Sequence, residues 1–328
     1  MALPYSALEA ITEDYYQKNR VEDIYFKASI MLYRLLGNGG NAINLVSGSD
    51  TVDGGKRLVE FLEHDEANSS TYGNSTSLSA TRKEIFNQAS FAWSGYNASN
   101  TINLDDQVQN GDSPRAMVKM IQGRLNNISK TIRNTMNEGI FGTRAASTDT
   151  YGFDGLGDLF NTTTTTAYGN IQEGDMAEWS ANVITTAEAI SYSVLQDIMA
   201  TASVGQTEED HPNLILTTRT LMDAYNAKLQ IQQRFVKDKD MVQAGFKHTL
   251  HDGVVLGYDA EIAAGTLYAL NLRHLFLKTH KDYNFTQPKW VAFSEAQPDL
   301  LTANCRWVGA LTTRHRAAHC KHSGLTAN

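Results

Sequence analysis

The residues with the richest side-chain chemistry lie near the end of the chain, in RWVGALTTRHRAAHCKHSGL, residues 306–325. This stretch holds three histidines, a cysteine, three arginines and a lysine, so a metal site or a nucleic-acid clamp must be considered. On a helix, His315 and His319 would share a face and could bind one ion. Tryptophan, valine, a threonine pair and a glycine favour a strand instead. On a strand these two histidines lie about 13 Å apart, at ~3.3 Å per residue, which one ion cannot bridge.

The neighbouring side chains do not complete such a site. Cys320 and His322 could be co-ligands, but two ligands do not make a zinc site. We therefore expect no stoichiometric metal here. We expect an extended ribbon in which Arg314 and Arg316 pair with acidic groups of the same or a neighbouring chain.

Three other stretches invite a chemical interpretation. GSDTVDGGKR ends like a phosphate-binding loop, but Asp50 stands where the first glycine is needed and Arg57 replaces the Ser or Thr after Lys56. His248 and His251 flank a predicted turn near Asp252, where a metal site is a minor alternative to a plain turn. Acidic pairs in polar turns are typical of solvated loops. The sequence contains no Gly-x-Ser-x-Gly, His-Glu-x-x-His or Cys-x-x-Cys motif, so we expect no enzyme and no cofactor.

Composition sets the outer limits. The chain has 328 residues, 41% of them hydrophobic, which predicts two or three lobes with real cores. A net charge of −8 disfavours tight nucleic-acid binding over the whole surface. The first twenty residues lack the pattern of a secretory signal, and no apolar run reaches the ~20 residues of a membrane span. Two cysteines fit a protein without disulfides.

Apolar spacing and turn residues outline the elements that position these groups. Residues 1–36 predict a helical arm that ends at GNGG. Residues 41–105, rich in Gly, Ser, Thr and Asn, predict a long and mostly solvated β-hairpin. A loop of this length with little core is normally functional or bound to a partner. Helices are also predicted from about Glu173 to Ala202 and over 218–235. Strands are predicted over 211–218, 254–262, 266–272 and 275–280, with extended ribbon over 286–328.

The strongest helix signal covers about 27 residues, from Ser113 as N-cap through Pro114 in the first turn to Gly142 as C-cap. At ~1.5 Å per residue this helix is about 40 Å long. Its apolar stripe comprises Met117, Ile121, Leu125, Ile128, Ile132, Met136 and Ile140.

The same helix carries five basic residues and one acid, Glu138. At about 100° per residue, four of the basic residues fall within roughly 60° of one another, mostly away from the stripe. Two interpretations stay open: the face is solvated or pairs with acids of an adjacent arm such as Glu9, Glu13 and Asp14, or it faces packaged DNA. The four residues are Arg115, Lys119, Lys130 and Arg133.

The order of these parts resembles the major capsid protein of tailed bacteriophages. Residues 112–142 look like its spine helix, and FDGLGDLF at 153–160 resembles the Gly-Leu-x-x-Leu element that follows it. Residues 211–235 and 245–277 resemble the strands and helix of the axial domain, and 303–325 are similar to its closing ribbon. The resemblance covers nearly the whole chain and depends on the order of five pieces.

This resemblance implies an α+β fold of the tailed-phage, herpesvirus and encapsulin type. Its expected parts are an N-terminal arm (1–40), an extended β-hairpin loop (41–105), a peripheral domain (106–184) with the spine helix (114–141), an axial domain (185–285), and a return to the peripheral domain through a closing β-ribbon (286–328).

The function implied is structural. The subunit would assemble through hexamers and pentamers into an icosahedral shell that encloses double-stranded DNA, in the virion after assembly in the host cytoplasm. The implied partners are other copies of itself, a separate scaffolding protein, a portal, decoration proteins and DNA held by non-specific contact, with no membrane. The alternatives are an encapsulin-like nanocompartment subunit and an α/β small-molecule-binding protein or enzyme.

Overall fold

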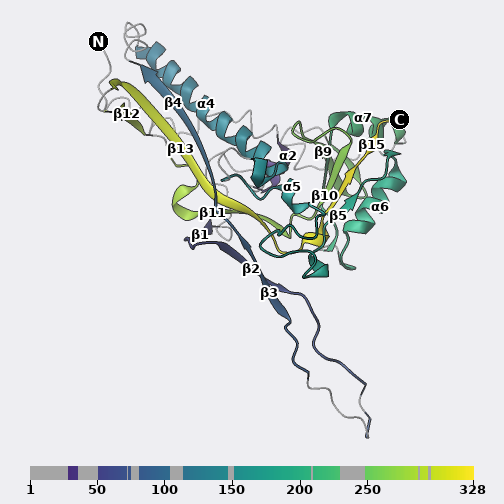
Figure 1. The fold of residues 1–328 in the computed structure, drawn as a ribbon. Coiled ribbons are helices and arrows are strands. Elements are labelled where there is room, and N and C mark those ends of the chain that lie inside the picture. The colour runs from purple at the N-terminus through teal and green to yellow at the C-terminus, as the bar shows by residue number, and fades with distance from the viewer. Residues whose placement is uncertain are drawn as a thin grey trace.

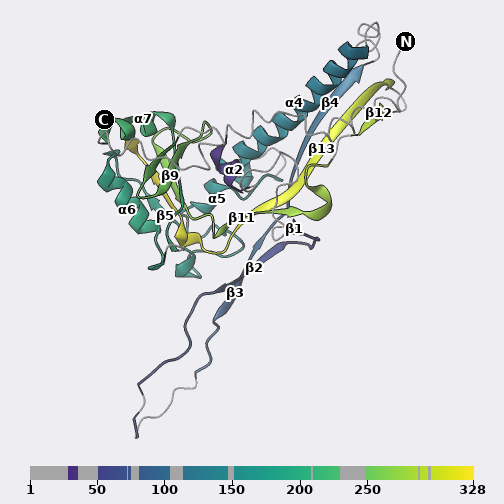
Figure 2. The same cartoon turned by 180° about the vertical axis from the view of Figure 1, so that it is seen from behind.

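The computed structural model describes residues 29–35, 51–71, 73–74, 81–103, 114–146, 151–207, 210–229, 248–286, 289–294 and 297–328. Two main β-sheets form two lobes, and a thin β-hairpin projects away from both (Figures 1 and 2). Most of the predicted arm, its GNGG end and the last residues of the predicted helix 218–235 lie outside the described residues. No described helix is both long and apolar enough to cross a membrane.

The first lobe is a five-stranded sheet with a long helix along it. Helix α4 (Pro114–Phe141) runs beside strands β4 (Ser94–Asn103) and β13 (Gln297–Thr313), which pair antiparallel (Figure 1). The sheet is completed by β1 (Thr51–Val52), β11 (Leu275–His280) and β12 (Trp290–Ser294). The predicted helix is confirmed, and so is its stripe: the residues Ile121, Leu125, Ile128, Ile132, Met136 and Ile140 are all buried.

Close backbone packing ends this helix. The Gly142 amide still donates to the Glu138 carbonyl at 2.9 Å, and the Gly157 amide donates to the Gly142 carbonyl at 3.0 Å. Gly157 belongs to the short helix α5 (Leu156–Leu159). A Cβ on the preceding Gly155 would lie only 2.4 Å from the Gly142 carbonyl oxygen. The glycines of the FDGLGDLF stretch therefore let the backbone of α5 pack directly against the C-terminal end of α4.

The second lobe is a six-stranded sheet with helices on one face. Its strand order is β5 (Asn182–Ile184), β14 (Cys320–Ser323), β10 (Thr266–Leu270), β7 (Leu214–Thr217), β9 (Val254–Tyr258) and β8 (His248–His251). Helices α6 (Tyr192–Ala202) and α7 (Arg219–Lys228) pack on the face that carries Ile215, Leu256 and Leu267.

The opposite face of this sheet joins the core of the first lobe. Helix α2 (Ile30–Leu35) lies against it, and Gly257 of β9 leaves the space that Ile30 fills. A Cβ at Gly257 would lie 2.3 Å from the Ile30 Cδ1 atom. The predicted strands over 211–218, 254–262, 266–272 and 275–280 are confirmed in position by β7, β9, β10 and β11.

Two predictions of secondary structure differ from the structure. The helix predicted from Glu173 to Ala202 is wrong in its first half, where a 3-10 turn (Ala177–Trp179), β5 and strand β6 (Glu188–Ala189) are found. Strand β5 is parallel to β14, and β6 is parallel to β15 (Leu325–Thr326). Pairing with chain more than 130 residues away therefore overrides the local apolar spacing. Helix α6 begins only after Ser191, whose side chain accepts from the Val194 amide.

The end of the chain also differs from a single closing ribbon. Strand β13 belongs to the five-stranded sheet, but β14 lies in the six-stranded sheet, between β10 and β5. A 3-10 turn at Arg316–Ala318 separates the two strands. The last segment therefore crosses from one lobe to the other.

Candidate functional site

The most unusual surface of the described chain is the outer face of the projecting hairpin. Strands β2 (Leu58–Glu63) and β3 (Phe86–Phe91) pair antiparallel, and side chains alternate between two faces along β2. The outer face exposes Val59, Phe61 and Phe86, with Phe61 81% and Phe86 73% exposed. Because Phe61 pairs with Gln88 and Phe86 with Glu63, the two phenylalanines are diagonal neighbours on one face. Two exposed aromatic rings side by side form an apolar patch of the kind that marks an interaction site.

The inner face of the hairpin is fastened to the five-stranded sheet by a buried charge. Glu60 is 3% exposed and forms ion pairs with Lys278 of β11 and with Arg314, the latter at 2.9 Å. The Thr312 hydroxyl donates to the same carboxylate at 3.1 Å. Burial alone would raise the pKa of Glu60, but the hydrogen bonds and charges of Lys278 and Arg314 hold the pKa below its ordinary value. We call Glu60, Lys278, Thr312 and Arg314 the hairpin anchor.

The predicted hairpin of residues 41–105 is therefore shorter as a paired unit. The ladder joins 58–63 to 86–91, while β4 belongs to the five-stranded sheet. Between the hairpin strands, the described residues of 64–85 form no further β-ladder and project beyond both lobes (Figures 1 and 2).

The Gly-rich stretch before the hairpin is a structural turn. Gly54 and Gly55 have φ of 136° and 123°, which only glycine adopts readily. The Gly55 carbonyl accepts from the Trp93 indole at 2.8 Å. Strand β2, not a helix, follows Lys56, so the strand–loop–helix setting of a phosphate-binding loop is not formed.

His319, Cys320 and His322 near the end of the chain are buried, and each of the two histidines has hydrogen-bond partners of its own. His322 lies 2.8 Å from the Glu188 carboxylate, and His319 contacts a backbone amide and a threonine hydroxyl. Burial raises the pKa of the Cys320 thiol to about 12, which keeps it protonated and a poor ligand. Among the described residues, no three His, Cys, Asp or Glu side chains converge in a way that would hold a metal.

The two arginines of this stretch do find acidic partners, as predicted, and within the same chain. Arg314 pairs with Glu60 in the hairpin anchor. Arg316 is only 1% exposed and donates to the carbonyls of Leu159, Asn161 and Trp179, with Glu173 at 3.7 Å. A fixed guanidinium therefore ties the turn at 316–318 to the segment that follows α4.

The basic residues of α4 are placed less uniformly than helical spacing suggests. Lys130 is exposed, but Arg133 is only 4% exposed and lies close enough to Cys305 to affect its pKa. Arg124 donates to the Asn100 side chain at 3.1 Å. The side chains of Arg115 and Lys119 lie outside the described ones. Lys130 and Arg133 thus do not form one solvent-facing surface within the subunit, because Lys130 is exposed and Arg133 is buried.

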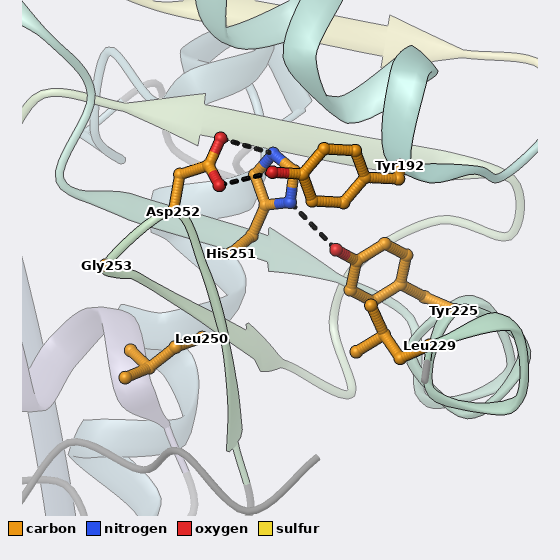
Figure 3. Close-up of a pocket in the computed structure, with 7 residues that line it drawn as sticks. All are labelled: Tyr192, Tyr225, Leu229, Leu250, His251, Asp252 and Gly253. Atoms are coloured by element: carbon orange, nitrogen blue, oxygen red, sulfur yellow. Dashed lines mark hydrogen bonds and ion pairs between the residues drawn. The ribbon is translucent and has the colours of Figure 1, made fainter. Parts of the chain in front are cut away.

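One pocket of about 210 Å³ lies beside the two-residue turn that joins β8 to β9 (Figure 3). Asp252 and Gly253 form this turn with φ of 47° and 83°, as a type I′ hairpin requires. The Tyr192 hydroxyl donates to Asp252 at 2.5 Å, and the Tyr225 hydroxyl lies 2.8 Å from His251 Nδ1. Figure 3 shows these side chains turned toward one another rather than toward a common empty point.

The chemistry of this pocket is that of a structural network. Burial raises the pKa of Tyr225 to about 12 and lowers the pKa of His251, so a protonated phenol and a neutral imidazole share this hydrogen bond at neutral pH. A phenol with that pKa is not an activated nucleophile at neutral pH. These bonds fix the turn at Asp252 against α6 and α7.

Comparison with known proteins identifies the fold. No protein-family model matches the chain, and no curated protein sequence matches it. The solved structure of the capsid asymmetric unit of cyanophage A-1(L) is similar, with a TM-score of 0.66, 15% identity, and 83% of this chain and 88% of that chain covered.

Two further capsid structures agree. The capsid of a native GTA particle aligns with a TM-score of 0.53 and 11% identity, and that of Myoviridae phage XM1 with 0.52 and 12%; each comparison covers 83% of this chain and 86% of the other. At these identities the likeness concerns the fold. The predicted α+β fold of the tailed-phage major capsid type is confirmed.

Proposed function

We propose that this chain is a structural subunit, the major capsid protein of a tailed phage, which assembles through hexamers and pentamers into an icosahedral shell around double-stranded DNA. The observation that carries the proposal is the projecting hairpin with Phe61 and Phe86 exposed. An apolar face on a two-stranded ribbon favours contact with a partner, since burial of each phenylalanine would contribute about 1.5–3 kcal/mol. In a symmetric shell the cover is a neighbouring copy.

The same proposal assigns a part of the capsid fold to each sheet and to the hairpin. The five-stranded sheet with α4 would serve as the peripheral domain, the six-stranded sheet with α6 and α7 as the axial domain, and the hairpin as the extended loop. Strand β13 and the terminal strand β14 would link the two domains. A separate scaffolding protein, a portal, decoration proteins and the virion location belong to the proposal as well.

Electron microscopy of the purified full chain tests this proposal, first alone and then with a scaffolding protein. We expect closed shells or capsomers from the natural sequence. The double variant Phe61→Ser with Phe86→Ser should abolish them and leave a folded subunit with unchanged far-ultraviolet circular dichroism. Tyr151→Ser is the matched control, because Tyr151 is 67% exposed but lies outside the hairpin, and it should assemble normally.

Three outcomes would count against the proposal. A monodisperse monomer under all conditions would contradict shell formation. Normal shells from the double phenylalanine variant would remove the hairpin from the interface. Shells isolated from infected cells with enzyme cargo instead of DNA would favour the nanocompartment alternative.

The same shells can test, at the exposed Lys130, the interpretation in which the basic residues of α4 face packaged DNA. Lys130→Glu should leave empty shells intact and lower the amount of retained genome, because the contact is electrostatic and independent of sequence. Failure of assembly in this variant would assign Lys130 to a contact between subunits.

A further inference from the structure

The two lobes are joined by a pair of chain crossings that carry three histidines. Residues 271–274 lead from β10 to β11, and residues 314–319 lead from β13 to β14. The first crossing carries His274, and the second carries His315 and His319. The rings of His274 and His315 lie 5.6 Å apart. We call Asn271, His274, Thr313, His315 and His319 the histidine joint.

His319 is the centre of this joint, and its bonds define one tautomer. The backbone amide of Asn271 donates to His319 Nδ1 at 3.1 Å, so this nitrogen carries no proton. The neutral ring therefore has its proton on Nε2, which donates to the Thr313 hydroxyl at 3.2 Å. The Thr313 hydroxyl in turn donates to the His274 carbonyl at 2.8 Å. These bonds run in one direction from the first crossing through the second and back.

A proton on Nδ1 would break this chain at its start, because the ring would then present an N–H to the N–H of Asn271. The Asn271 N–H cannot become an acceptor for the new proton, since a backbone amide N–H only donates. The charged ring would also be completely buried, as His319 is 0% exposed. Burial and the charges of His274 and His315 all lower the pKa of His319, to about 3.

The surrounding titratable groups add to this resistance. Burial and His274 lower the pKa of His315, whereas Asp210, in the turn before β7, acts in the opposite direction. Nδ1 of His315 is buried and has no hydrogen-bond partner. A charge on one ring therefore disfavours protonation of its neighbour, and the hydrogen bonds of the joint require a neutral His319.

We propose that the histidine joint is a proton-sensitive connection, which holds the two chain crossings together at neutral pH and loosens on acidification, while the apolar core shared by the two lobes keeps them in contact and each sheet stays folded. The inference goes beyond shell formation, because it concerns one chain and requires no neighbour. The pH range of this effect follows from the lowered pKa of His319. An open joint lets His319 return to its ordinary pKa near 6.5 and bind a proton, so each unit of pH below that value favours the open form up to tenfold, down to about pH 3.

The distance between the lobes can be measured directly with two spin labels. Ala292→Cys on β12 and Asp197→Cys on α6 place labels at exposed positions of the two sheets. The native Cys305 and Cys320 are buried with thiol pKa values of about 12, so labelling at pH 7.5 selects the introduced cysteines. Labelled chain is diluted with unlabelled chain, and pulsed electron–electron distances are recorded at pH 7.5 and 4.5.

We expect the distance distribution to shift or broaden at pH 4.5 in the otherwise natural chain. In His319→Asn the distance distribution should be the same at both pH values, because the asparagine amide cannot take up the proton. This holds whether the variant's joint is closed or open. His64→Asn, which removes a histidine outside the joint, should keep the full response. His274→Gln should make the transition less steep.

The proposal would be overturned by identical distributions at both pH values in the natural background. It would also be overturned by an undiminished response in His319→Asn, or by loss of secondary structure at pH 4.5 in circular dichroism.

Discussion

The five-stranded sheet is connected to its two neighbours by opposite kinds of chemistry. The hairpin anchor is ionised: Glu60 is buried between Lys278 and Arg314. The histidine joint is neutral: His319 is buried between an amide and a hydroxyl. Both lie at the same end of β13, yet one depends on charge and the other on its absence.

The difference teaches how each connection responds to its environment. A buried carboxylate is stable only when cations compensate its desolvation, so the anchor fails when Lys278, its largely buried partner, or the charge of Glu60 itself is removed. A buried neutral imidazole needs only hydrogen bonds, so the joint fails when a charge is added. Acid therefore reaches the histidine joint before it reaches the hairpin anchor.

The largest effect is expected from removing the buried charge of the anchor. Glu60→Gln keeps the shape of the side chain but leaves Lys278, whose side chain is 15% exposed, without its counter-charge. We expect a loss of about 3 kcal/mol in the free energy of unfolding, as for other broken buried pairs. Urea unfolding at pH 7 measures it. A loss below about 1 kcal/mol would mean that the anchor is not a buried ion pair in energetic terms.

A smaller effect is expected from acidification of the joint. The folded-state pKa of His319 is about 3, below the ordinary 6.5, so the unfolded chain binds more protons between these values and stability falls as pH falls. From pH 7 to 4.5 this one group should cost about 2.5 kcal/mol if the joint stays closed, and less if the joint loosens and the folded chain binds the proton as well. The measurement is urea unfolding at both pH values in the natural chain and in His319→Asn, whose smaller loss isolates the contribution of His319.

The anchor should be nearly silent in that experiment. The pKa of Glu60 is lowered, so its contribution is fully present above the ordinary value of 4.5 and is lost only as pH falls through the lower, folded-state pKa. The contrast between the two connections would be reversed if Glu60→Gln reduced the loss of unfolding free energy at pH 4.5 and His319→Asn left that loss unchanged.

The smallest effect is expected at the exposed side of the anchor. Arg314 is 55% exposed and stacks over the Phe276 ring at 4.7 Å. Arg314→Gln should cost about 1 kcal/mol or less, because solvent screens its charge and Lys278 still compensates Glu60. Urea unfolding of Arg314→Gln and Glu60→Gln under the same conditions compares the two losses in unfolding free energy. Equal losses would show that both cations are required.

The sequence by itself determined the elements whose stability is local. The spacing of Ile121, Leu125 and Ile128 through Ile140 predicts α4, and every described member of that stripe is buried. Short apolar runs between turn residues predict β7, β9, β10 and β11. The order of these parts was enough to predict the capsid fold. Apolar spacing predicts these elements because one face of each is buried in a core, and the spacing is the same whichever element packs against that face.

Only the tertiary structure decided which partner each element meets. Val183 lies within the helix predicted from Glu173 to Ala202, but it pairs with Lys321 in a parallel ladder. Arg133 fits a basic face, but it is only 4% exposed in the folded chain. His319 looks like a metal ligand, but the amide of Asn271 and the hydroxyl of Thr313 use both of its nitrogens. These outcomes depend on groups brought together from distant parts of the chain, and the spacing of residues along one segment carries no information about the far partner of a hydrogen bond or an ion pair.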